Sequence, residues 1–176
     1  MQNHQRLQQL SGALYWVALA LSVLLPIIVL VSAGKGVSDP ASLLSRAPLV
    51  PAGTPVTTAQ AGLVAAVALV SVLAMVAALR GMVRLFAAYR DGEVLSEGNA
   101  DTILRIGRNL LIVAGFTVLV PSLQTLILSW NAGQRMLSIG LDQGTLGFLL
   151  AAGLLTVIGF AMREAAAVKS ENAGFV

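Results

Sequence analysis

The sequence predicts an all-α integral membrane protein, a four-helix bundle in which each helix crosses a lipid bilayer. Three observations lead to this fold class: four long apolar stretches, a very apolar composition, and an uneven distribution of Lys and Arg between the connecting segments. Hydrophobic residues make up 57% of the 176 residues and charged residues only 11%, whereas soluble domains contain about 45–50% and about 25%. We therefore expect a single membrane domain, residues 1–176, with lipid as its main solvent.

Four stretches are long enough to cross the hydrocarbon layer, which takes about 20 apolar residues. They cover residues 13–33, 59–79, 110–130 and 141–162. None shows the alternating polarity of a transmembrane β-strand, so each is expected to be a helix. The first is longer than the apolar core of a signal peptide and is expected to be retained. The fourth is the least regular, because Asp142 lies at its start.

The distribution of basic residues predicts how the chain is oriented. Eight of the eleven Lys and Arg lie in the N-terminal tail, in the segment between the second and third spans, or in the C-terminal tail. Cytoplasmic segments carry such an excess, so both termini and the central segment are expected in the cytoplasm. Aromatic side chains near span ends fit the headgroup level; they are Tyr15, Trp16 and Trp130.

The outer segment of residues 34–58 contains four prolines, which forbid a long helix. Asp39 followed by Pro40 predicts an N-cap and a short helical turn through about Ser45. The second outer segment, residues 131–140, is short and polar.

The central segment, residues 80–108, is too long for a bare connection. Gly92 suits the position just after a helix end, and Ser96 suits an N-cap. We therefore predict a cytoplasmic helical hairpin between spans two and three, with Asp101 and Arg105 paired one turn apart. The second helix is expected to continue past the hydrocarbon because four apolar residues recur on one of its faces: Met82, Leu85, Phe86 and Tyr89.

The hairpin residues resemble the motif of a known bacterial membrane family. The motif has an aromatic residue, a short spacer, Gly-Glu-x-Phe-Ser-x-x-Asn, and then Leu-Arg and Ile-Gly. Leu95 stands where Phe is usual, and the end of the chain, residues 163–176, is similar too. The matching residues are Gly92, Glu93, Ser96, Asn99, Leu104, Arg105, Ile106 and Gly107.

This family is the four-span group known as domain of unknown function 2975, and it has no established activity. Its members are often encoded beside a small helix-turn-helix regulator. The resemblance therefore implies a multi-pass protein of the bacterial cytoplasmic (inner) membrane with a part in membrane-linked gene regulation.

The chain offers little for catalysis or metal binding. It has no Cys, and its one His, His4, lies in the N-terminal tail. The carboxylates of Glu93, Glu97 and Asp101 are interleaved with arginines and are expected to form a solvated helix start rather than an active site or a cation site. We expect no enzymatic activity, no cofactor and no metal. Basic residues flank the spans instead of clustering on one face, so we also expect no direct nucleic-acid contact.

Polar residues gather near Pro121 in the third span: Ser122, Gln124 and Thr125. Pro121 is expected to kink the helix, with nearby hydroxyls meeting the carbonyl that it frees, and Gln124 is expected to bond another helix. Packing is favoured over a pore because no span interior carries an ionisable residue. Small residues such as Gly81 and Gly159 are expected to permit close helix approach.

These observations favour a non-catalytic protein that acts through protein–protein contacts in the membrane or cytoplasm, beside its contact with the lipid bilayer. Two alternatives stay open: a structural accessory subunit of a larger membrane complex, and a small transporter or permeability factor. A hairpin that only sets topology, or that contacts anionic lipid, is the plainer interpretation of the same charges. The expected interaction surface consists of Arg84, Arg90, Glu93, Glu97, Asp101, Arg105 and Arg108.

Overall fold

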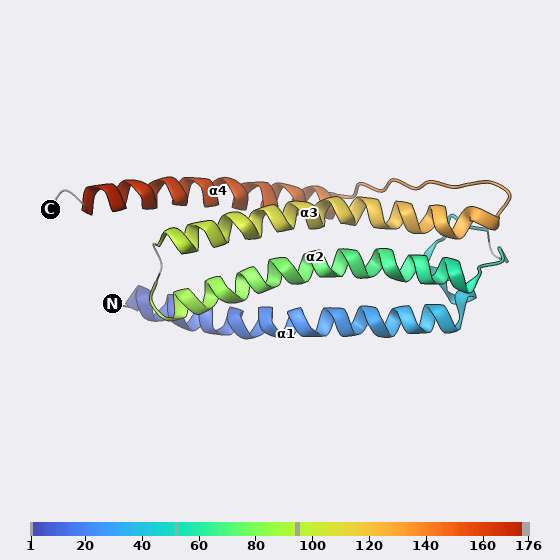
Figure 1. Ribbon diagram of the computed structural model, residues 1–176, viewed down its shortest axis with the longest axis horizontal. Helices are drawn as coiled ribbons and strands as arrows, with labels where there is room; N and C mark the ends of the chain where they lie inside the picture. The colour runs from blue at the N-terminus through green and yellow to red at the C-terminus, as the bar shows by residue number, and fades with distance from the viewer. Residues whose placement is uncertain (1, 52, 94–95, 174–176) are drawn as a thin grey trace.

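The computed structural model describes residues 2–51, 53–93 and 96–173, and regular secondary structure in these ranges is entirely helical. Two short 3-10 helices, η1 (Pro40–Arg46) and η2 (Ser129–Asn131), accompany four long helices (Figure 1). The long helices are α1 (Gln2–Ser38), α2 (Thr58–Arg90), α3 (Glu97–Leu128) and α4 (Gln143–Ala173).

Each long helix has the length and composition to cross a membrane. This finding supports the predicted multi-pass membrane class, and each predicted span overlaps one of the four helices. Two parts of the family-like motifs, Leu95 and residues 174–176, lie outside the described residues.

The helices lie side by side in chain order, and each packs against its neighbour in the sequence (Figure 1). α2 and α3 are the inner pair and hold most of the buried residues, whereas α1 and α4 have a partner along one side only. Large apolar side chains on the outer helices are exposed, with Leu150 of α4 at 75%. Lipid is the solvent that accounts for such surfaces, since an exposed apolar face of this size is unfavourable in water.

Capping motifs are found at both helix ends that flank the connection between α2 and α3. After α2, Gly92 adopts φ +90°, its N–H donates to Tyr89 O, and Glu93 N–H donates to Ala88 O at 2.9 Å. This pair of bonds is a Schellman motif, which a glycine accommodates without strain. The Ser96 hydroxyl accepts from Asn99 N–H and caps α3. The roles predicted for Gly92 and Ser96 are confirmed.

Small residues bring α3 close to both of its neighbours near this connection. A Cβ on Gly81 of α2 would lie 2.7 Å from Ile106 Cγ1, and one on Gly107 would lie 2.8 Å from the Thr156 backbone of α4. One on Gly159 would lie 2.7 Å from Leu104 N. The close approach predicted for Gly81 and Gly159 is confirmed. Around these contacts lies a buried cluster that includes Ala78, Leu85, Ile103, Ile106, Leu110 and Ala152.

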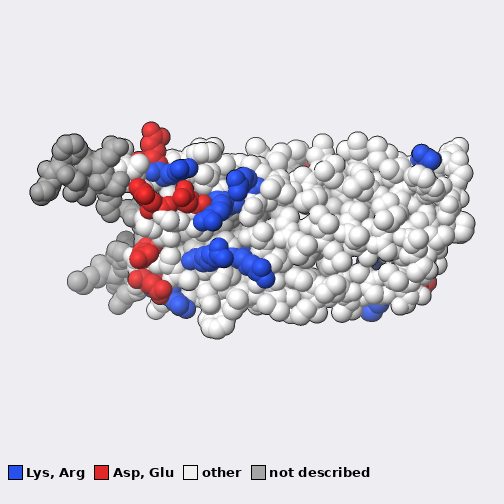
Figure 2. All heavy atoms as spheres, in the orientation of Figure 1, with Lys and Arg blue, Asp and Glu red and all other residues white. Residues whose placement is uncertain are grey.

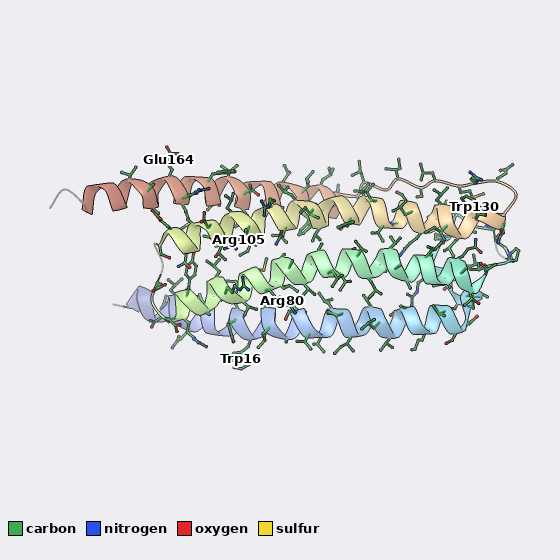
Figure 3. All side chains as sticks on the ribbon, in the orientation of Figure 1. Trp16, Arg80, Arg105, Trp130 and Glu164 are labelled. Carbon is green, nitrogen blue, oxygen red and sulfur yellow. The ribbon has the colours of Figure 1, made fainter. Side chains whose placement is uncertain are left out.

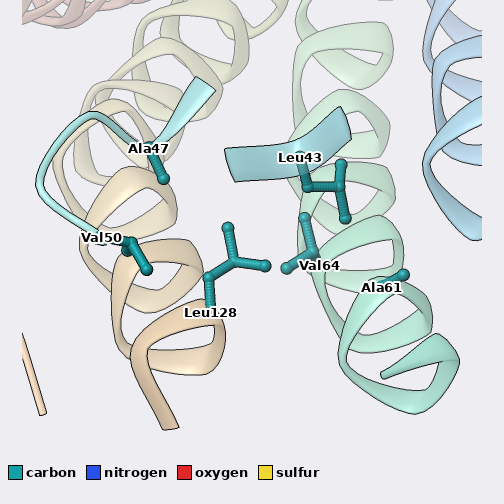
Figure 4. Packing of buried hydrophobic residues seen from close by; sticks show 6 residues of the cluster. All are labelled: Leu43, Ala47, Val50, Ala61, Val64 and Leu128. Atoms are coloured by element: carbon teal, nitrogen blue, oxygen red, sulfur yellow. The ribbon is translucent and has the colours of Figure 1, made fainter. Parts of the chain in front are cut away.

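A second cluster lies at the opposite end of the molecule, where η1 and the segment that follows it pack over α2 and α3 (Figure 4). Its buried residues are Leu43, Ala47, Val50, Ala61, Val64 and Leu128. The helical turn predicted after Pro40 is present as η1, but Asp39 makes no side-chain cap. Its carbonyl accepts the Ser42 hydroxyl at 2.6 Å instead. The predicted N-cap position of Asp39, with Pro40 at the start of the helix, is confirmed.

The fourth helix departs from its predicted bounds. α4 begins at Gln143, where Asp142 acts as the cap: its carboxylate accepts Thr145 N–H at 2.6 Å. Before it, residues 135–142 have no regular structure and run back along α3. The Ser122 hydroxyl of α3 donates to Ser138 O at 2.5 Å and holds this segment in place. The predicted span at 141–162 is therefore helical except at its start, because the Asp142 carboxylate serves a helix end better than a helix interior.

Candidate interaction surface

The charged side chains at the end formed by the α2–α3 connection lie in two layers. Acidic side chains lie near the tip, and most basic ones are set back toward the middle of the molecule (Figure 2). The acidic rim consists of Asp91, Glu93, Glu97, Asp101 and Glu164, all exposed. We refer to this part of the molecule as the charged end.

A hollow of about 250 Å³ lies between α2 and α3 behind this rim. We call it the arginine groove, because Arg80 and Arg84 line it from α2 and Arg105 lines it from α3. Arg80 and Arg105 lie near one level along the long axis, and Trp16 of α1 lies near the same level (Figure 3). The groove also contains Ala77, Gly81, Thr102, Ile106 and Asn109. Arg84 and Arg105 belong to the predicted surface.

The other predicted basic residues have separate surroundings. Arg90 lies 5.2 Å from the Tyr15 ring centroid, a cation–π contact that ties the end of α2 to α1. Its Nε also lies 3.5 Å from the carboxylate of the adjacent Asp91. Arg108 is exposed on α3 and is not among the groove residues. Arg90 thus has a structural role, and Arg108 does not join the groove.

The predicted pair of Asp101 and Arg105 is not formed. Arg163 of α4 takes the partner role instead, with its Nε 3.5 Å from Asp101 Oδ1. The close packing of α3 on α4 brings this arginine beside Asp101, which an argument from spacing along one helix could not foresee. Both side chains are well exposed, so the pair contributes little, about 0–1 kcal/mol.

The two predicted glutamates are exposed on either side of the helix junction. The Glu93 carbonyl accepts the Asn99 side-chain amide at 2.5 Å, so its backbone is fixed while its carboxylate faces solvent. Glu97 lies in the first turn of α3, where a negative charge is favourable. The family-like motif thus has clear structural roles here, since its Gly, Ser and Asn residues shape the junction.

The intramembrane polar residues serve the local backbone. The Ser122 hydroxyl lies 2.9 Å from Val118 O as well as bonding Ser138 O, and the Thr125 hydroxyl donates to Pro121 O at 2.9 Å. None of these hydroxyls meets the Thr117 carbonyl that Pro121 frees. Gln124 lines a far-end cavity of about 350 Å³ that η1 also lines. Within the described part of the chain Gln124 makes no hydrogen bond to another helix, so that prediction was wrong.

Gln60 makes the cross-helix bond expected of Gln124. Its Nε2 donates to Ile127 O at 2.8 Å, and its Oε1 accepts from the Thr57 backbone and from Asn131 Nδ2. It also completes a capping box with Thr57 at the start of α2. The sequence held the signal, since Thr followed three residues later by Gln is a capping-box pattern.

Among the described residues, no group of three His, Cys, Asp or Glu side chains lies close enough to hold a metal ion. No model of a protein family, no curated protein and no solved structure matches the chain. The four-span family suggested by the motif therefore stays a prediction.

Proposed function

We propose that this is a non-catalytic membrane protein that binds another protein through the acidic rim of its charged end. The proposal places this end and both termini in the cytoplasm of a bacterial cell, with the four helices in the inner membrane. The excess of Lys and Arg in these segments supports that orientation.

The main support for this proposal is that the backbone bearing the Glu93 and Glu97 side chains is held by hydrogen bonds. A Schellman motif, a Ser96 cap and the Asn99 amide fix the backbone around Glu93 and Glu97, while both side chains remain exposed. α2 ends at Arg90 and α3 begins at Glu97, so both helices extend beyond the predicted spans at 59–79 and 110–130. A connection that only joined two spans would not need these extensions. An exposed acidic surface is complementary to a basic partner surface and speeds its encounter. The motif resemblance supports a helix-turn-helix regulator as that partner.

The test replaces both glutamates, Glu93→Gln and Glu97→Gln, which leaves the Lys and Arg count and hence the predicted topology unchanged. Protein captured from the native host with the tagged wild type should fall several-fold with this variant, at equal expression. Asp39→Asn is the matched control, because it removes one exposed carboxylate at the opposite end. Capture that is the same for all three proteins would contradict the proposal.

One observation favours a second candidate, an accessory subunit of a larger membrane complex. Ser138 lies beside Ser122, roughly 12 Å along α3 from Trp130 at about 1.5 Å per residue. Exposed apolar side chains flank it, with Leu137 at 61% and Ile139 at 67%. Irregular backbone at membrane depth is stable only where protein or water covers it. Native purification should then recover the chain at fixed stoichiometry with larger subunits, whereas recovery as a free monomer would exclude this candidate.

A further inference from the structure

The arginine groove concentrates positive charge without neutralising it. Within the described part of the chain, none of Arg80, Arg84 and Arg105 has an ion pair. The nearby carboxylates of Asp91 and Asp101 pair with Arg90 and Arg163 instead. Three guanidinium groups that line one hollow repel each other unless an anion lies between them.

The depth of the groove matches the headgroup layer of a membrane. From Arg80 back to the start of α2 at Thr58 the helix is roughly 33 Å long, at about 1.5 Å per residue. The hydrocarbon layer is about 30 Å thick. Trp16 lies near the same level as Arg80 and Arg105 (Figure 3), and tryptophan is enriched at that interface. The groove is thus placed where lipid phosphates are found.

On the membrane side of the groove, the same faces of α2 and α3 carry exposed apolar side chains. Along α2, Leu73 precedes Ala77 and Arg80 at helical spacing and is 66% exposed. Along α3, Ile112 follows Arg105 and Asn109 at the same spacing and is 49% exposed. A cationic hollow beside an exposed apolar face is complementary to an amphiphilic ligand. The hollow can hold a charged headgroup, and the apolar face can contact acyl chains.

We propose that the arginine groove binds the phosphate of an anionic phospholipid in the leaflet at the charged end. The planar guanidinium groups bind phosphate oxygens in pairs, and the Asn109 amide adds a neutral donor. The acyl chains follow the surface past Leu73 and Ile112. A free phosphate would use the arginines but not the apolar face. This inference does not depend on the proposed protein partner.

The test measures lipid binding to the purified protein in a neutral detergent by native mass spectrometry, with phosphatidylglycerol and phosphatidylcholine as probes. The groove variant carries Arg80→Gln, Arg84→Gln and Arg105→Gln. It should lose roughly a hundredfold in affinity for phosphatidylglycerol, because each basic side chain near an anionic surface contributes about fivefold. The charge-matched control carries Arg90→Gln, Arg108→Gln and Arg163→Gln, which lie outside the groove, and should lose less than fivefold.

Two further measurements separate a phospholipid site from a site for a soluble anion. The variant with Lys at the three groove positions keeps the charge and the topology, and it should bind phosphatidylglycerol about tenfold less tightly, because Lys lacks the paired donors. Inorganic phosphate at millimolar concentration should not displace the lipid. Displacement would identify a site for a soluble anion. Equal losses in the groove and control variants would show only a diffuse surface charge, and either result overturns the proposal.

Discussion

The two ends of the molecule differ in how their polar side chains are used. At the charged end, Gly92, Ser96 and Asn99 fix the backbone of the helix ends, and most charged side chains are left at the surface. At the far end, the polar side chains themselves hold the structure together: Gln60 joins α2 to α3, and Ser122 and Ser129 hold the segment that leads to α4. Polar side chains that hold the structure together are poor candidates for binding a partner, so this difference favours our proposal that the charged end binds one.

The largest loss of stability is expected at Gly107, where α3 can approach α4 closely because glycine has no side chain. Gly107→Val would place a Cβ 2.5 Å from the Thr156 hydroxyl and 2.8 Å from the Thr156 backbone, which cannot yield without moving α4. We expect a loss of about 3 kcal/mol in the free energy of unfolding, the upper end for overpacking. Unfolding in mixed detergent micelles, followed by circular dichroism, measures it. Gly115→Val is the control, because nothing lies within 4 Å of its added Cβ; equal losses would refute the close-packing account.

A smaller loss of stability is expected at the far end, where a hydrogen bond of the Gln60 side chain joins α2 to α3. Gln60→Leu removes the donor to Ile127 O and the partner of Thr57 and Asn131. Losing the hydrogen bonds of this buried side chain should cost about 2 kcal/mol in the free energy of unfolding. The control is Gln124→Leu, which removes no hydrogen bond seen in the described residues and should change stability by less than about 0.5 kcal/mol. If Gln124→Leu proved the more harmful change, our assignment of the cross-helix bond to Gln60 would be wrong.

Much of the fold could be predicted from the sequence, because its signals are local. Apolar length predicted the four helices, and single-residue preferences predicted the roles of Gly92 and Ser96. Small residues predicted that helices approach closely, but which residues of two helices meet could not be predicted in this way. The partner of Asp101 depends on the longitudinal register of α3 and α4, which is set by Gly107 and Gly159. Only two of the seven predicted interaction residues line the arginine groove, and Arg80, which also lines it, was not among those seven.

The smallest effect concerns Asp142, whose carboxylate accepts Thr145 N–H at the start of α4. Asp142→Asn retains an acceptor for this N–H, whereas Asp142→Ala removes it. Amide hydrogen exchange at Thr145 in the purified protein should therefore be equally slow in the wild type and in Asp142→Asn, and faster in Asp142→Ala. The first N–H groups of a helix have no partner within the helix, so the start of α4 opens more often when this acceptor is lost. Equal exchange in all three proteins would show that this side chain does not cap α4.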